Sequence, residues 1–168
     1  MAKIFPLKPH DFETHLQVSA CYVEVQGKLL ILHKSGVWSV PAGKVEKEET
    51  PEHAAHRELF EETQITADPK FLKTLYIRKK QVDFVFHMFH VPLPTIPHVR
   101  LSPEHDEYRW LFPQEIEELP LMEGALELLH HYLNNRLKLE AADGKKQLPD
   151  VANAETVPTA LGKNPSLH

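Results

Sequence analysis

Three glutamates, Glu58, Glu61 and Glu62, form the densest group of residues in this chain whose types and spacing could do chemistry. A helix is expected to begin at Pro51, because proline is tolerated at the first helical position and the threonine before it can cap free backbone N–H groups. If this helix ends near Thr63, the three carboxylates are surface neighbours that span roughly 100° of one face. They repel one another, and a cation between them would reverse that effect. The alternative interpretation is a solvated acidic face.

The net charge of the chain is concentrated in the same region. The chain has 24 acidic and 19 basic residues, a formal net charge of −5, and the segment 43–65 contributes four of these negative charges. A negative balance argues against a protein that coats DNA, because such binding depends on Lys and Arg. Hard divalent cations such as Mg²⁺ prefer carboxylate oxygens and share them with substrate phosphates. The charge therefore suits a polyphosphate that is held through metal ions.

The segment around the glutamates resembles the Nudix box, G-x5-E-x7-R-E-U-x-E-E-x-G-U, in which U is an aliphatic residue. Eight of its nine specified positions match, namely Gly43, Glu49, Arg57, Glu58, Leu59, Glu61, Glu62 and Ile65. The ninth is Gln64, where the box has a glycine that can take a left-handed conformation after the helix. Glutamine there is expected to cost about 1 kcal/mol or to end the helix differently.

The segment before the box is also similar to the Nudix family. Residues 38–43 resemble the lead-in W-x-x-P-G-G, with Ala42 in place of the first glycine. The resemblance implies an α/β fold, the Nudix α/β/α sandwich with a mixed β-sheet. Local patterns predict strands over 16–26, 28–33, 37–40, 69–79, 82–91 and 107–112, and helices over 51–63, 113–119 and 122–139. Residues 1–140 are expected to form the Nudix hydrolase domain, and residues 141–168 a poorly ordered tail.

The resemblance also implies roles for individual residues. Glu58, Glu61 and Glu62 correspond to metal-binding glutamates of the family, with Mg²⁺ as the expected cofactor and Mn²⁺ as a possible substitute. The backbone carbonyl of Ala42 is a candidate further ligand. Several carboxylates this close would titrate as a coupled set.

Two further candidates concern catalysis. Arg57 matches the box arginine, which orients the catalytic glutamates by ion pairing, here with Glu49. The general base is either Glu58 or a glutamate from a later loop. The acidic segment 104–110 offers Glu104, which is favoured over Glu107 because Glu107 begins a predicted strand. The alternative for this segment is an acidic surface turn.

The implied reaction is hydrolysis of a pyrophosphate bond in a nucleoside diphosphate linked to a further group. Arg78, in a short basic run, could contact substrate phosphates, and Trp110, Phe84 and Phe86 could stack on a base. A solvated strand end is the alternative for Arg78, and core packing is favoured for the two phenylalanines. The leading hypothesis is a (deoxy)nucleoside triphosphate that gives the monophosphate and pyrophosphate. ADP-ribose, a dinucleoside polyphosphate or an RNA 5′ end are alternative substrates, and a non-catalytic nucleotide-binding module is an alternative of another class.

The remaining features concern the setting of the protein. The one cysteine, Cys21, excludes a disulfide within the chain and is compatible with a reducing compartment. No signal peptide is visible, and no apolar run approaches the length of a membrane span. The sequence therefore predicts a cytoplasmic protein that binds a small nucleotide and no membrane. Its oligomeric state stays open, and a homodimer is possible.

Overall fold

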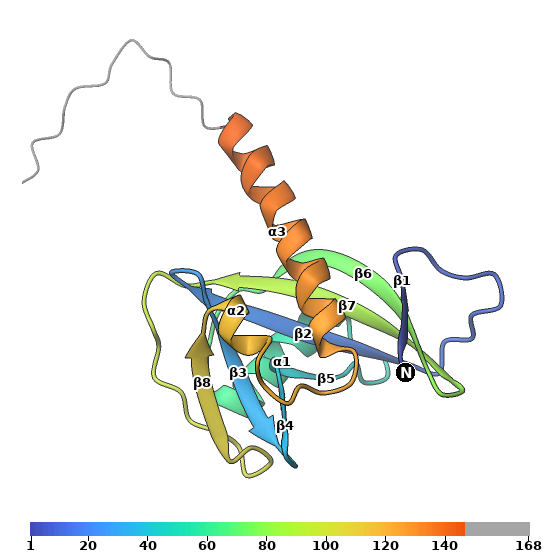
Figure 1. The fold of residues 1–168 in the computed structure, drawn as a ribbon, viewed down its shortest axis with the longest axis horizontal. Coiled ribbons are helices and arrows are strands. Elements are labelled where there is room, and N and C mark those ends of the chain that lie inside the picture. The colour runs from blue at the N-terminus through green and yellow to red at the C-terminus, as the bar shows by residue number, and fades with distance from the viewer. Residues whose placement is uncertain (147–168) are drawn as a thin grey trace, which may run out of the picture.

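A bent, mixed β-sheet forms the centre of the molecule in the computed structural model, which describes residues 1–146 (Figure 1). The strands are β1 (Lys3–Phe5), β2 (Leu16–Val25), β3 (Lys28–Lys34), β4 (Val37–Ser39), β5 (Ala42–Lys44), β6 (Lys70–Lys79), β7 (Val82–Pro92) and β8 (Glu107–Leu111). The helices are α1 (Pro51–Thr63), α2 (Pro113–Ile116) and α3 (Ala125–Lys146). The strand order is β1-β6-β7-β2-β3-β4, with β5 beside β2 and β8 beside β3. β2 and β7 run parallel, and the other paired strands are antiparallel.

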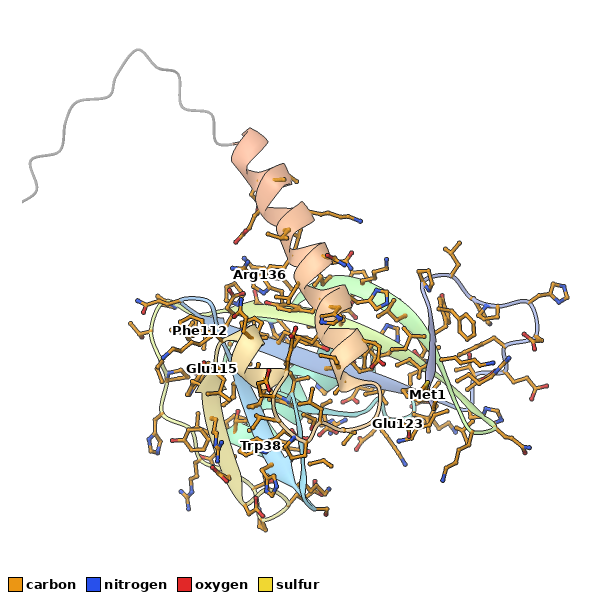
Figure 2. The ribbon with its side chains drawn as sticks, viewed as in Figure 1. Met1, Trp38, Phe112, Glu115, Glu123 and Arg136 are labelled. Atoms are coloured by element: carbon orange, nitrogen blue, oxygen red, sulfur yellow. The ribbon has the colours of Figure 1, made fainter. Side chains whose placement is uncertain are left out.

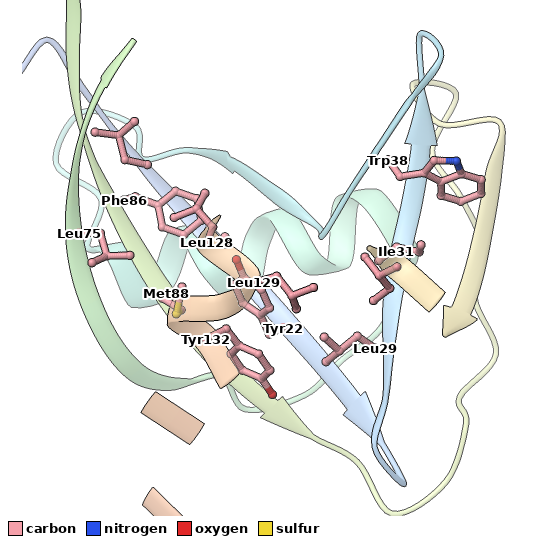
Figure 3. Close-up of a cluster of buried hydrophobic side chains, with 13 residues drawn as sticks. Tyr22, Leu29, Ile31, Trp38, Leu75, Phe86, Met88, Leu128, Leu129 and Tyr132 are labelled. Atoms are coloured by element: carbon pink, nitrogen blue, oxygen red, sulfur yellow. The ribbon is translucent and has the colours of Figure 1, made fainter. Parts of the chain in front are cut away.

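The bend of the sheet arises where β2 and β3 separate. The two strands pair next to their connecting turn, at Glu24 with Leu29 and at Val25 with Lys28. In that turn Gln26 and Gly27 both have positive φ, as a tight two-residue hairpin requires. Farther from the turn β5 pairs with β2 instead, and β4 and β8 flank β3. The strands thus diverge into a V, which is visible in Figure 3.

Helix α1 covers one face of the sheet and has a well-defined start and end. The Thr50 hydroxyl accepts a hydrogen bond from the His53 N–H at 3.1 Å, and Pro51 follows in the first turn. At the other end Gln64 takes the left-handed conformation, with φ 59° and ψ 18°, and its N–H donates to the Phe60 carbonyl. The helix therefore ends as it would with the box glycine, and glutamine bears the left-handed conformation at a cost of about 1 kcal/mol.

Two clusters of buried apolar side chains hold the layers together. One lies between α1 and the sheet and includes Leu30, Ala55, Leu59 and Phe89. The other lies on the opposite face, where α2 and the start of α3 pack on the sheet (Figure 3). The predicted α/β/α arrangement is therefore confirmed. Within residues 1–146, no helix has the length and apolar character that a membrane span needs.

The predicted domain boundary after residue 140 falls within a helix. Helix α3 begins at Ala125 and continues to Lys146, so residues 141–146 are helical. Alanine, leucine and glutamate around Ala141 are strong helix formers, which accounts for the extension. The remainder of the predicted tail, residues 147–168, lies outside the described residues. Strands β1 and β5, each three residues long, were not predicted.

A polar cluster anchors α3 to the sheet. The carboxylate of Glu24, on β2, is 8% exposed and accepts hydrogen bonds from the Tyr132 hydroxyl at 2.9 Å and the Arg136 guanidinium at 2.5 Å. The Tyr132 ring also stacks on Tyr22, with ring centroids 4.3 Å apart. The Tyr132 hydroxyl lies 2.9 Å from Nδ1 of His90 as well. A buried carboxylate with these partners fixes where α3 crosses the sheet.

The substitution Tyr132→Phe is expected to lower the free energy of unfolding by about 1–3 kcal/mol, because Glu24 loses one of its donors while it stays buried. Urea denaturation monitored by circular dichroism measures the change. Tyr108→Phe is the matched control, because Tyr108 is 41% exposed on β8. An equal loss in both variants, or none in Tyr132→Phe, would contradict the anchoring role of this hydrogen bond.

Candidate active site

The guanidinium of Arg57 connects Glu49, Glu58 and Glu61 through hydrogen bonds. Its Nη1 donates to Glu58 at 2.7 Å and to Glu61 at 3.2 Å. Its Nε and Nη2 donate to the two carboxylate oxygens of Glu49 at 2.8 and 2.9 Å, and Nη2 also donates to the Lys44 carbonyl. The predicted ion pair between Arg57 and Glu49 is therefore confirmed. It holds the pKa of Glu49 well below its usual range.

The carboxylate of Glu58 packs directly against the backbone of β5 at Gly43. A Cβ atom placed on Gly43 would lie only 1.9 Å from the Glu58 carboxyl carbon. Any side chain at this position would therefore displace Glu58. The glycine of the box is needed here because the carboxylate occupies the space of its missing side chain.

Glu62 lies beside the same strand and is nearly buried, at 7% exposed. Its Oε2 accepts a hydrogen bond from the Ala42 N–H at 3.3 Å. Burial, together with the negative charges of Glu58 and Glu104, raises the pKa of Glu62 to about 8. Burial also raises the pKa of Glu58, although Arg57 opposes this shift. The site thus concentrates carboxylates where their mutual repulsion is poorly screened.

The loop before β8 brings Glu104 to the same site. Its charge raises the pKa of both Glu58 and Glu62, and its Oε2 lies 3.2 Å from Nζ of Lys34. The structure therefore brings Glu104 next to Glu58 and Glu62 of α1, although Glu104 is far from both in the sequence. Lys34 belongs to no motif in the sequence, so it could not be predicted as part of the site.

A cavity of about 470 Å³ lies next to these carboxylates. Glu62, Glu104, Ala42 and Gly43 contribute to its lining, so the cavity and the acidic site are continuous. Its apolar lining comes from the sheet, from the segment 121–124 and from the start of α3. Phe84 and Phe86 line it and also belong to or pack on the core cluster, so the core interpretation and a ligand contact are compatible.

The two predicted substrate contacts lie elsewhere. Arg78 pairs with Asp83 at 2.6 and 2.8 Å and with Asp11 at 3.2 Å, and it does not line the cavity. Side chains alternate along a strand, so Arg78 and its neighbour Lys79 point to opposite faces of β6, and Lys79 lines the cavity. Trp110 packs against the cluster on the α1 face. This placement does not support a substrate contact for Arg78 or Trp110.

Comparison with known proteins settles the family. The family model described as "NUDIX domain" matches residues 13–132. This chain belongs to the Nudix family. Phosphatase NudJ of Escherichia coli K12 is 35% identical to it over 115 residues, which cover 62% of this chain and 72% of NudJ.

Solved Nudix structures share the fold. The MutT protein from Methanosarcina mazei Go1 superposes with a TM-score of 0.64 at 21% identity, over 75% of this chain and 97% of that protein. The NUDIX domain of Shewanella oneidensis NrtR, solved in complex with ADP ribose, gives a TM-score of 0.64 at 18% identity, over 79% of this chain and 94% of that domain. The chain is accordingly a Nudix hydrolase that acts on phosphoanhydride bonds.

Nudix hydrolases in general need a divalent metal, and the carboxylates of this site fit one. Within residues 1–146, no three His, Cys, Asp or Glu groups converge closely enough to enclose a metal ion as they stand. The donors are nevertheless hard oxygens, and Glu58 and Glu62 are held by burial at pKa values above their usual range. A bound cation would relieve that repulsion. Glu61, which is exposed and held by Arg57, lies on the same helix face.

The substitution Gly43→Ala is expected to lower kcat by about 100-fold or more, because the new methyl group would displace the Glu58 carboxylate. Steady-state kinetics on any hydrolysed nucleotide measures the effect, and circular dichroism shows whether the fold is kept. Gly144→Ala serves as the control, because a Cβ at Gly144 meets no atom within 4 Å. Equal activity of the two variants would mean that the position of Glu58 is unimportant.

Proposed function

We propose that this Nudix hydrolase splits the pyrophosphate bond of a (deoxy)nucleoside triphosphate with Mg²⁺ and releases the monophosphate and pyrophosphate. The observation that carries the proposal is that the nearly buried carboxylate of Glu62, together with Glu104, lines a cavity of about 470 Å³. In this proposal the phosphates lie at the carboxylates, and the nucleoside extends into the cavity. Mn²⁺ is a possible substitute for Mg²⁺, because both accept oxygen ligands.

Glu58, Glu61 and Glu62 would hold the metal, and the Ala42 carbonyl beside them is a further candidate ligand. The metal, when bound, would neutralise phosphate charge and acidify a bound water. Arg57 has a separate task, which is to fix the side chains of Glu58 and Glu61 through its hydrogen bonds. Orientation of this kind raises the rate because the groups need no rearrangement during the reaction.

The acceptor of the proton from the attacking water is proposed to be Glu58. Its position is fixed by Gly43 and Arg57, and burial raises its pKa, which makes it a stronger base. Glu104 remains the second candidate for this role. Its carboxylate pairs with Lys34 and is 65% exposed, so its position is less restricted.

The cavity supplies the positive charge that phosphates require. Lys34 and Lys44 contribute to its lining at the end where the carboxylates lie. An ammonium near the phosphates would stabilise the negative charge that develops on the leaving group.

The test is turnover across a panel of nucleoside triphosphates, ADP-ribose and diadenosine tetraphosphate with Mg²⁺, with separate detection of pyrophosphate and orthophosphate. We expect pyrophosphate from the triphosphates. Orthophosphate as the first product would contradict the proposed cleavage position, and the name of the relative, Phosphatase NudJ, makes this the main competing outcome. No turnover of any nucleotide with Mg²⁺ or Mn²⁺ would favour a non-catalytic binding module.

Within the same assay, Glu61→Gln is expected to lower kcat by about 100-fold or more while the protein stays folded, because an amide is a poor ligand for Mg²⁺. Glu118→Gln provides the matched control, since Glu118 is exposed and lies outside α1. An unchanged rate in Glu61→Gln would remove Glu61 from the metal site.

A further inference from the structure

The cavity beside the carboxylates is apolar over most of its wall. Its floor is formed by strand residues such as Val18 and Phe86, and Leu128 and Leu129 of α3 close it from the other side. Such side chains can pack on the flat faces of a base, but the edges of a base carry hydrogen-bond donors and acceptors. Burial without partners costs free energy for each of these groups. A base inside this cavity therefore needs polar partners from the protein.

The charged residues of the lining lie at its exposed rim. Nζ of Lys34 lies 3.2 Å from Glu104, and Nζ of Lys79 lies 3.3 Å from Glu123. Glu123 also lies 3.3 Å from the amino group of Met1, and Figure 2 shows these two residues side by side. All four side chains of the two ion pairs are partly exposed to solvent. Polar contacts to a base farther inside must therefore come from another residue.

Tyr22, on β2, brings a hydroxyl group into this apolar interior. The residue lines the cavity and is only 2% exposed. Its ring stacks on that of Tyr132, with ring centroids 4.3 Å apart and ring planes 10° apart. In Figure 3 the two hydroxyls lie at opposite ends of the stacked pair. The Tyr132 hydroxyl donates to Glu24 in the anchor of α3, whereas Tyr22 is the member of the pair that lines the cavity.

The Tyr22 hydroxyl has no hydrogen-bond partner within residues 1–146, so burial alone raises the pKa of Tyr22. In Tyr132, by contrast, the hydrogen bond with Glu24 also contributes to the raised pKa. Buried tyrosine hydroxyls usually find a partner, because an unpaired one costs free energy. Phenylalanine would fill the same space and stack on Tyr132 without that cost. A few polar groups in an otherwise apolar pocket are typical of ligand recognition, so the missing partner of Tyr22 is sought in the ligand.

The position of Tyr22 on β2 relates it to the carboxylates. Ala20 of β2 pairs with Ala42 of β5, and the Ala42 N–H donates to Glu62. Tyr22 is two residues farther along β2 and therefore faces the same side of the sheet, about 7 Å along the strand. A nucleotide whose phosphates lie at Glu62 and whose nucleoside extends into the cavity would thus place the nucleoside beside Tyr22.

We propose that the Tyr22 hydroxyl forms a hydrogen bond with the edge of the base and so determines which nucleoside triphosphate this hydrolase prefers. The inference deepens the proposed function and rests on it, because it needs the nucleoside to lie in this cavity. A phenol hydroxyl can donate and accept a hydrogen bond. The bases differ in the groups that they present along their edges. One hydroxyl at a fixed position therefore meets a matching atom in some bases and leaves a polar atom unpaired in others, which discriminates between them.

The test compares Tyr22→Phe with the unmodified protein in kcat and KM for ATP, GTP, CTP and UTP with Mg²⁺. We expect KM to rise about tenfold for at least one triphosphate, unequally among the four, with kcat unchanged. KM for inorganic tripolyphosphate, which has no base, should stay the same. Tyr108→Phe is the matched control, because it removes the same hydroxyl at an exposed position on β8 and should change none of these values.

Three kinetic results would overturn the inference and leave the proposed function standing. The first is KM values for all four triphosphates within threefold of the unmodified protein. The second is an equal rise for all four, because a contact with the base edge depends on the base. The third is a rise of the same size for tripolyphosphate, because the substitution would then act through the carboxylates.

The stability of the same variant separates a role in binding from a role in the fold. The urea midpoint of Tyr22→Phe should not fall, because the hydroxyl has no partner within residues 1–146 to lose. Tyr132→Phe, in the other ring of the stacked pair, is expected to lose stability. A loss in Tyr22→Phe as large as that in Tyr132→Phe would mean that the hydroxyl stabilises the fold, and would overturn the inference.

A measurement without turnover completes the test. AMP, GMP, CMP and UMP are titrated calorimetrically into the metal-free protein, and Kd for the monophosphate that binds most tightly should rise about tenfold in Tyr22→Phe. Binding that depends on Tyr22 without turnover of any triphosphate would support the inference and overturn the proposed function. Binding that is equal in Tyr22→Phe would overturn the inference. Neither binding nor turnover of any nucleotide would overturn both.

Discussion

Repulsion between carboxylates gathered in a partly buried space is the constraint on which the rest of this structure depends. Glu58 and Glu62 come from one helix, and Glu104 comes from a distant loop. Arg57 offsets part of the charge and fixes the outer side of the cluster through Glu49. The inner side needs a strand that can approach without a side chain, and Gly43 meets that need. Many features of the box motif thus hold acidic groups close together in a space that suits a cation.

The bend of the sheet links this cluster to the cavity. Because β3 leaves β2 soon after their turn, β2 has room for β5, and β5 carries Ala42 and Gly43 to the carboxylates. The same divergence opens the V in which the apolar wall lies (Figure 3). Helix α3, anchored through Glu24, closes the V from the other side. The divergence of β2 and β3 therefore determines both where the carboxylates lie and where the cavity opens.

Much of the fold and of the acidic site could be predicted from the sequence, because the signals are local. The start of α1 at Pro51 follows from capping, and the strands follow from alternation between punctuating residues. The pairing of Arg57 with Glu49 followed from the resemblance to the Nudix box. The cavity could not be predicted, because its wall is assembled from β1, β7 and the start of α3. Arg78 and Trp110 were assigned by residue type alone, and strand alternation directs both away from the cavity. At Gln64 the residue type departs from the box motif, but the backbone keeps the left-handed conformation that the box glycine can take.

We infer that Glu62 is buried in order to bind a metal ion, and the sharpest test is whether a proton is released when the metal binds. With its pKa raised to about 8, Glu62 carries a proton at pH 7 in the metal-free protein and must lose it to bind a cation. Isothermal titration with Mg²⁺ at pH 7, in buffers of different ionisation enthalpy, should therefore show release of about one proton. Since Glu62 loses its proton as pH rises through about 8, affinity for Mg²⁺ should increase over that interval. Glu62→Gln should abolish the release. Binding of Mg²⁺ without proton release in the unmodified protein would contradict the account.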